Sequence, residues 1–358
     1  MMTTTHGPEM AFRDVTRWLE GKAAGSSAGQ GDGLPCPQLE GGDWVELRDM
    51  LQTFVSQNED PSCSSNYANA EPDDIHSLLS VLRSGANAGV LTQDSALGLV
   101  SLASLKILSR KKVNRERIGG QGLECVARLA SAVKDSPDLA AECANVVLNF
   151  CYERTNVESF LDCGGVHTLA TYLRRPEENV QANAAGALQS ISYHERGRQQ
   201  LMDAGVIPDV VRLMRSPNAR VQARSVGAIH NLSSEPGTIG TIRKVEGIEA
   251  LVALLRVPND TVNSSAAGAL QNISREVASR KIIKAHGAVD LLADLLSSRN
   301  TQAQVCAAGA LLNILGPELG NSQGTTRRIF GKLLSHCLTL SVLYEAIWDQ
   351  KAELIQLS

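Results

Sequence analysis

The sequence predicts an all-α protein built from stacked helical repeats, and three observations lead to this prediction. The 358 residues are 43% apolar but only 4% aromatic, a composition that favours close helix–helix packing over a β-sandwich. A short motif recurs at a fixed interval along the chain. A second segment with apolar residues at helical spacing precedes each copy of that motif.

The recurring motif is seven residues long, and successive copies begin 41 residues apart. The copies read GALQSIS at 186–192, GAIHNLS at 227–233, GALQNIS at 268–274 and GALLNIL at 309–315, with a weaker copy, NVVLNFC, at 145–151. The preceding segments read VHTLATYL, IPDVVRLM, IEALVALL and VDLLADLL, each after a glycine, at 165, 205, 247 and 287. Recurrence at one spacing indicates a repeat architecture.

Each unit is therefore expected to contain a helix, a glycine turn, a second helix, a polar loop and a longer third helix. The loops RRPEEN, RSPNAR, RVPND and SSRNT connect the second helix to the third. Proline and asparagine in these loops end one helix and cap the next. Because a unit of about 40 residues cannot bury its apolar face alone, neighbouring units must stack into an α-solenoid.

These units resemble armadillo repeats, whose second helix carries a G-[IA]-x-x-L-V-x-L-L element and whose third carries A-A-G-A-L-x-N-[LI]-S. AAGALQN at 266–272 is closest to the repeats of β-catenin and plakophilin. The resemblance covers 122–316 well and 73–121 more loosely. It implies a right-handed α-solenoid superhelix that binds partner proteins.

Four regions are expected along the chain. Residues 1–72 hold 4 basic and 11 acidic side chains and form a largely disordered region with two short helices, at 11–19 and 44–55, that dock on the first repeat or on a partner. A divergent first repeat follows at 73–121, then the armadillo array at 122–316. Residues 317–358 should form capping helices, with Leu343 and Trp348 facing the last repeat.

The resemblance implies that the third helix of each unit lines a concave groove. One polar position recurs there among apolar neighbours, at Asn149, Ser190, Asn231, Asn272 and Asn313. A carboxamide has both a donor and an acceptor, so a row of them can bind the backbone of an extended partner peptide. The alternative is that each asparagine bonds the preceding loop and only stabilises its repeat.

Other side chains of the groove are expected to select the partner. Asn183, Arg224 and Arg275 lie near the asparagine row, and the two arginines favour acidic or phosphorylated motifs, unless they are ordinary solvated surface. Importin-α-like nuclear carriers have tryptophan one helical turn before the asparagine, where this chain has Asn145 and then four glycines, at 186, 227, 268 and 309. Nuclear import is therefore disfavoured.

Composition excludes several classes of protein. With 34 basic and 38 acidic residues the net charge is -4, which argues against a polybasic nucleic-acid binder. The eight cysteines form no CxxC motif and the seven histidines show no metal spacing, so no metal, cofactor or small-molecule substrate is expected. No membrane span or cleavable signal is evident. We expect a cytoplasmic protein, with nuclear or cytoskeletal association left open.

The sequence therefore predicts a non-catalytic adaptor or scaffold that binds an extended segment of a partner protein. A regulator of a small GTPase, either a chaperone or an exchange factor, is an alternative that the acidic amino-terminal region leaves open. A structural component of axonemes or cell junctions, packed end to end, is a third. The possibility that residues 11–19 occupy the groove as an internal ligand also stays open.

Overall fold

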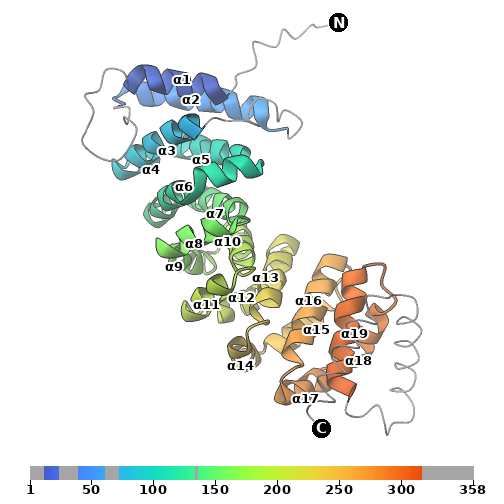
Figure 1. Cartoon of the computed structure of the whole chain (residues 1–358). Coiled ribbons are helices and arrows are strands. Elements are labelled where there is room, and N and C mark those ends of the chain that lie inside the picture. The colour runs from blue at the N-terminus through green and yellow to red at the C-terminus, as the bar shows by residue number, and fades with distance from the viewer. Residues whose placement is uncertain (1–11, 24–38, 61–71, 134–135, 317–358) are drawn as a thin grey trace, which may run out of the picture. The chain divides into compact units, whose positions relative to one another are not determined.

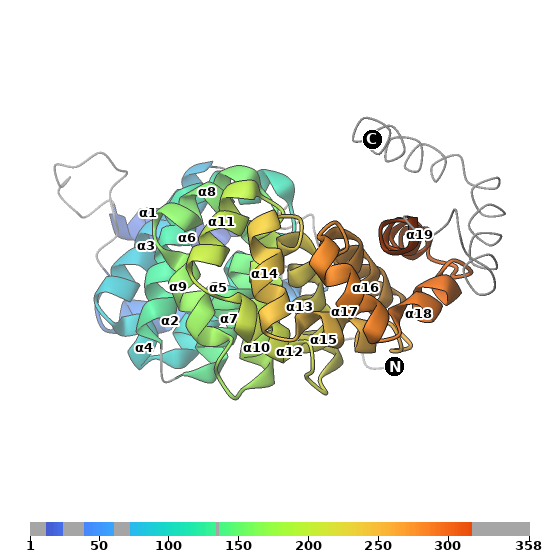
Figure 2. The same cartoon turned by 90° about the horizontal axis from the view of Figure 1, so that it is seen from below.

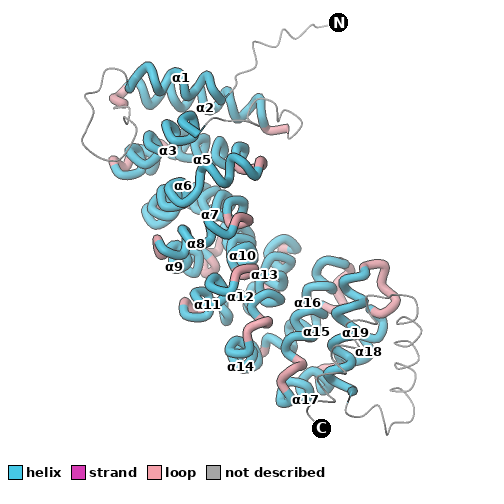
Figure 3. Tube along the Cα trace, viewed as in Figure 1, coloured by secondary structure: helices cyan, strands magenta, loops and turns pink. Residues whose placement is uncertain are grey.

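The computed structural model describes residues 12–23, 39–60, 72–133 and 136–316. These residues form helices and their connecting turns, with no strand among them (Figures 1 and 3). The all-α prediction is confirmed. The capping helices predicted for 317–358 lie outside the described residues.

The chain divides into two compact units, Met1–Gln200 and Leu201–Ser358, and α11 (Glu195–Asp203) crosses the boundary between them. The first unit contains α1 (Phe12–Ala23), α2 (Gly42–Asn58), α3 (Pro72–Asn87), α4 (Val90–Gln93), α5 (Ser95–Leu108), α6 (Lys112–Ala132), α7 (Pro137–Phe150), α8 (Arg154–Asp162), α9 (Gly165–Tyr172) and α10 (Glu178–Ile191). The second contains α12 (Ile207–Leu213), α13 (Ala219–Leu232), α14 (Pro236–Lys244), α15 (Gly247–Leu254), α16 (Asp260–Ile273), α17 (Val277–Ala285), α18 (Ala288–Leu295) and α19 (Thr301–Leu315).

The helices follow one another in threes, as the repeat predicts. The sets are α8–α10, α11–α13, α14–α16 and α17–α19. Helix α6 combines the first two helices of the preceding repeat, because Gly119 interrupts it with a non-helical conformation (φ 48°, ψ -151°), and α7 is the third. The segment α3–α5 is a looser version of the same unit, with only four residues in α4.

The third helices of successive repeats pack on one another within each unit. In the first unit α2 packs on α5, α5 on α7 and α7 on α10; in the second, α13 packs on α16 and α16 on α19 (Figures 1 and 2). Small residues make this approach close, since Ala184, Ala185 and Ala187 of α10 are fully buried. The hydrophobic core therefore runs from one repeat to the next instead of closing within any of them.

The two amino-terminal helices dock on the looser unit. Helix α1 packs on α3 and α2 packs on α5, and the rings of Phe12 and Phe54 meet between α1 and α2 at 5.6 Å. Arg48 of α2 forms an ion pair of 3.2 Å with Asp94, the residue that caps α5. These two helices extend the stack toward the amino terminus.

Asparagine caps the third helix at three equivalent positions. The side chains of Asn218, Asn259 and Asn300, each 41 residues apart, accept hydrogen bonds from backbone N–H groups in the first turns of α13, α16 and α19. This satisfies donors that have no partner inside the helix. The capping role predicted for these loop asparagines is confirmed.

A second recurring position closes the other end of the third helix. Asn156 donates to the carbonyl of Phe150 at 3.2 Å, and Thr238 donates to the equivalent carbonyl of Leu232 at 2.7 Å. The repeat between them has Gly197, where a Cβ would lie 2.2 Å from the carbonyl oxygen of Ile191. In this repeat the backbone at Gly197 therefore lies close to the end of the third helix, whereas in the neighbouring repeats a side chain donates a hydrogen bond to the equivalent carbonyl.

The turn between the first and second helices requires a left-handed backbone in each repeat. Gly164, Gly205 and Gly287 adopt it, with φ between 65° and 74°. The fourth equivalent residue is Glu246, with φ 59°, the one positive-φ residue other than glycine in the described part of the chain. A side chain in this conformation costs about 1 kcal/mol relative to glycine.

The Glu246→Gly variant is therefore expected to raise the free energy of unfolding by about 1 kcal/mol. The lost carboxylate contributes little, since it is 76% exposed and lies 3.8 Å from Arg215. Urea denaturation measures the change. Glu246→Ala is the matched control, because it removes the same charge but keeps a Cβ in the strained conformation. An equal gain in both variants would show that the charge, and not the backbone, is responsible.

Candidate groove of the third helices

The recurring polar position lies near the carboxyl end of each third helix. It is occupied by Asn149 on α7 and Ser190 on α10 in the first unit, and by Asn231 on α13, Asn272 on α16 and Asn313 on α19 in the second. The four asparagines are half-buried, whereas Ser190 is only 4% exposed. We call these five residues the amide row.

In the second unit the amide row connects neighbouring repeats. The amide nitrogen of Asn272 donates to the carbonyl of His230 at 3.3 Å and to the hydroxyl of Ser233 at 3.1 Å. Asn313 makes the same two bonds, at 3.1 and 3.0 Å, to the residues one repeat later, Gln271 and Ser274. The donors are thus engaged inside the protein, and the hydrogen bonds described for these side chains leave their carbonyl oxygens without a protein donor.

The first unit uses different residues for this link. Asn149 donates to the carbonyl of Asn145 in its own helix at 3.0 Å. Asn183, one of the predicted groove residues, is 4% exposed and donates to the carbonyl of Ala141 at 2.8 Å, across 42 residues. That separation equals the separation of Asn272 from His230. The structure therefore gives Asn183 a contact between repeats, and its contact with a ligand stays a prediction.

Two of the glycines one turn before the amide row lie against side chains from the preceding repeat. A Cβ at Gly268 would lie 2.3 Å from Nε2 of His230, and one at Gly309 would lie 2.3 Å from Nε2 of Gln271. We call Gly268 and Gly309 the glycine seats, because a side chain of the preceding repeat occupies the space that a tryptophan at either position would need. Burial of His230 lowers the pKa of its imidazole.

The two predicted arginines differ in exposure. Arg224 on α13 is half-buried, whereas Arg275, directly after the C-cap of α16, is exposed. The backbone carbonyl of Arg275 accepts a hydrogen bond from Arg280 at 3.2 Å, which fixes the turn that carries it. Their selection of acidic motifs stays a prediction.

Two exposed tyrosines occupy equivalent positions in adjacent repeats, a relation that the sequence analysis above does not include. Tyr152 and Tyr193 are 56% and 64% exposed and lie just beyond the carboxyl ends of α7 and α10. They are 41 residues apart, each three residues after a member of the amide row. The repeat interval itself is the signal that relates them.

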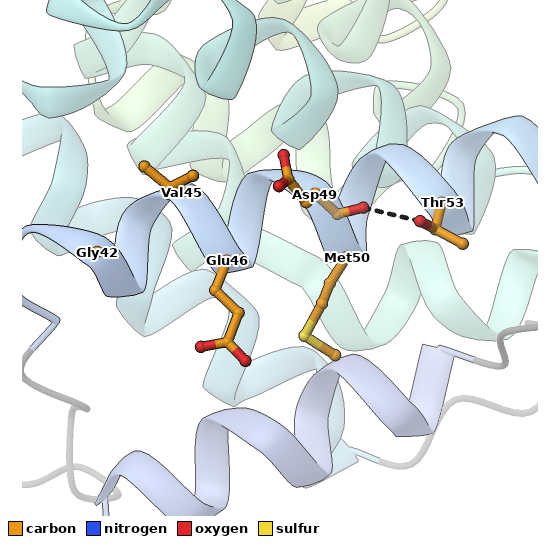
Figure 4. Close-up of a pocket in the computed structure, with 6 residues that line it drawn as sticks. All are labelled: Gly42, Val45, Glu46, Asp49, Met50 and Thr53. Atoms are coloured by element: carbon orange, nitrogen blue, oxygen red, sulfur yellow. Dashed lines mark hydrogen bonds between the residues drawn. The ribbon is translucent and has the colours of Figure 1, made fainter.

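Two shallow hollows lie elsewhere in the first unit. One, of about 420 Å³, is lined by a single face of α2, and Figure 4 shows the hydroxyl of Thr53 donating to the carbonyl of Asp49 at 2.8 Å beside it. The other, of about 320 Å³, lies between the amino ends of α7 and α10 and is lined by Asp138, Glu177 and Glu178 among others. Arg175 bonds Glu177 and holds the pKa of that carboxyl below its usual value.

Neither hollow brings together a nucleophile and a base. Within the described ranges no three His, Cys, Asp or Glu side chains are grouped to hold a metal ion, and no helix is long and apolar enough to cross a membrane. Cys125, Cys143, Cys151 and Cys306 are buried free thiols. Burial raises the pKa of Cys125 to about 11, so its thiol stays protonated at neutral pH.

Comparison with known proteins agrees with the repeat geometry. Residues 194–234 and 236–275, which contain α11–α13 and α14–α16, match the family model of the armadillo/β-catenin-like repeat. A search of curated proteins finds no match to this chain.

Three similar solved structures are engineered proteins. One engineered protein is 26% identical, with a TM-score of 0.60 over 66% of this chain and 96% of its own. A designed armadillo repeat protein is 21% identical, with a TM-score of 0.59 over 65% of this chain and 99% of its own. Another, solved in complex with the peptide (KR)4, is also 21% identical, with a TM-score of 0.57 over 65% and 98%.

Stacked three-helix units at a constant interval, with third helices packed in series, define an α-solenoid repeat protein. The sequence of those units and the matching family model make the assignment more specific. The two repeats at 194–234 and 236–275 match the armadillo/β-catenin-like repeat, and the fold is that of designed armadillo repeat proteins.

The buried imidazole of His230 predicts a dependence of stability on pH. Its pKa is lowered in the folded state, so the unfolded chain binds more protons, and the free energy of unfolding should fall as pH drops below about 6.5. The control is His230→Gln, because Gln271 occupies the equivalent seat in the next repeat. Urea denaturation between pH 5 and pH 8 should show that the free energy of unfolding falls less steeply with decreasing pH in the variant than in the wild type. Equal slopes would contradict the assignment.

Proposed function

We propose that this armadillo repeat protein is a non-catalytic adaptor or scaffold that binds an extended segment of a partner protein along its third helices. The observation that supports this is the state of the amide row in the second unit. Asn272 and Asn313 are held by bonds from their amide nitrogens to the preceding repeat, and each keeps a carbonyl oxygen as an acceptor. A fixed acceptor can bind a peptide N–H without further loss of side-chain freedom.

The spacing of the row suits a peptide backbone. Adjacent packed helices are about 8–10 Å apart, and an extended chain advances about 3.3 Å per residue. One acceptor per repeat therefore corresponds to about three residues of the bound segment. A backbone contact of this kind is independent of the partner's side chains, which agrees with a binding mode for linear segments.

A related protein supports the mode of binding but not the identity of the ligand. A designed armadillo repeat protein with the same fold has been solved with the peptide (KR)4. The exposed Arg275 of this chain favours a different, acidic segment over the second unit, because a guanidinium binds carboxylates in a bidentate manner.

Substitution of Asn272 separates stability from binding. Asn272→Ala removes two bonds between repeats and should lower the free energy of unfolding by about 1–2 kcal/mol. It also removes the acceptor, so affinity for a bound peptide should fall by about tenfold. Asn272→Asp removes the amide donors but keeps an oxygen acceptor, so it should lose stability and retain affinity. Urea denaturation and calorimetry measure the two effects.

The peptides for this test are selected from a phage-displayed library of random dodecapeptides against the wild-type chain. Asn300→Ala is the control for stability alone, because it removes the cap of α19, costs about 1 kcal/mol and leaves the amide row intact. Unchanged affinity in Asn272→Ala, with its stability lowered, would show that the row is purely structural and would overturn the proposal.

A further inference from the structure

The exposed tyrosines of the first unit form a repeated surface feature. Tyr152 and Tyr193 are the two aromatic residues among the large hydrophobic side chains that are exposed in the described part of the chain. They occupy the same place in adjacent repeats, directly after the C-cap residues of α7 and α10, and these two helices pack on each other (Figure 1). We call them the tyrosine pair.

The backbone that carries the tyrosine pair is fixed. The N–H of Tyr193 bonds the carbonyl of Ser190, and its carbonyl accepts from Arg198 at 3.2 Å. Glu153, which follows Tyr152, has little exposure and pairs with Arg115 at 2.7 Å. The rings are thus presented from ordered turns, so that binding a partner does not require the receptor to fold.

The charged groups beside the tyrosine pair are neutralised. Arg154 pairs with Glu158 at 3.0 Å, and Arg196 pairs with Asp162. Glu153 is paired with Arg115, as described above. Glu195, which is exposed, and Arg198, which donates to the carbonyls of Ser192 and Tyr193, have opposite charges. The formal charges around the pair therefore sum to zero, and the surface offers ring faces and phenol hydroxyls. It therefore suits an uncharged partner segment better than an acidic or a basic one.

The interval between α7 and α10, the packed helices that carry the two rings, favours one conformation of that segment. Packed neighbouring helices lie about 8–10 Å apart, which corresponds to three residues of an extended chain. In a β-strand, residues three apart point to opposite faces, so one strand could not present both to the pair. In a polyproline II helix, three residues make one turn of about 9 Å and return to the same face.

We infer that the tyrosine pair binds a proline-rich segment of a partner protein in the polyproline II conformation, with prolines three residues apart on the two rings. Proline packs flat on an aromatic face and keeps the segment extended before binding. The backbone carbonyls of such a helix have no internal partners and accept hydrogen bonds from the phenol hydroxyls. This inference rests on the proposed function, since it names the partner class for one stretch of the third helices.

The test uses protein labelled with 3-fluorotyrosine, in which the five tyrosines of the chain give separate fluorine signals. Tyr152→Phe and Tyr193→Phe assign the two signals of the pair. A peptide of four Pro-Pro-Ala units is titrated, with a Gly-Ser-Ala peptide of equal length as control. Both signals should shift saturably with the proline peptide only. Absence of a shift in either signal, or equal shifts with both peptides, would overturn the inference.

Substitution of the rings measures their contribution. Tyr152→Ala and Tyr193→Ala should each weaken binding of the Pro-Pro-Ala peptide by about fivefold, whereas Ser234→Ala, at the equivalent exposed position of the second unit, should leave it unchanged. Circular dichroism and thermal unfolding establish that the variants are folded. Equal affinity in the wild type and both tyrosine variants would overturn the inference.

One further variant separates this inference from the proposed function. Asn149→Ala removes the amide of the row nearest to Tyr152 but leaves both rings in place. If binding of the proline peptide needs both rings and is weakened by Asn149→Ala, both claims are supported. Binding that needs the rings but is indifferent to Asn149→Ala supports the tyrosine pair and contradicts the amide row in this stretch. Failure of the proline peptide, while library peptides still depend on Asn272, overturns only the tyrosine inference.

Discussion

The contact between one third helix and the next is the constraint on which the rest of the structure depends. Alanine and glycine faces bring these helices close, and each repeat closes its neighbour's core. The hydrogen bonds obey the same geometry, since Asn183, Asn272 and Asn313 each reach a carbonyl 42 residues earlier in the chain. These bonds span separate stretches of the chain, and their equal separations follow from the constant length of the repeats.

Structural support and ligand recognition are not exclusive roles for the amide row. A carboxamide has separate donor and acceptor atoms, and the bonds to the preceding repeat use only the donor. The same bonds fix the orientation of the acceptor. A side chain that was free to rotate would lose entropy on binding, and the repeat contact removes that loss beforehand.

The sequence was sufficient to predict the features that recur in every repeat. It was not sufficient to predict hydrogen-bond partners, which depend on how one helix is oriented against the next. The 41-residue interval predicted the three-helix units, and the polar loops predicted the caps at Asn218, Asn259 and Asn300. The acceptors of the Asn272 amide were not predictable, because they depend on the rotation of α16 against α13. The left-handed turn fell at Glu246, one residue before the glycine chosen from the sequence, because the turn keeps strict register with Gly205 and Gly287.

The glycine seats restrict how the protein can evolve new specificity. A larger residue at Gly268 or Gly309 would collide with His230 or Gln271, which already occupy that space. An aromatic ring at either place would require the side chain of the preceding repeat to leave that space. A tryptophan platform for lysine-rich cargo would therefore compete with a packing contact between repeats, so that a gain of this ligand would alter the stacking of the array as well.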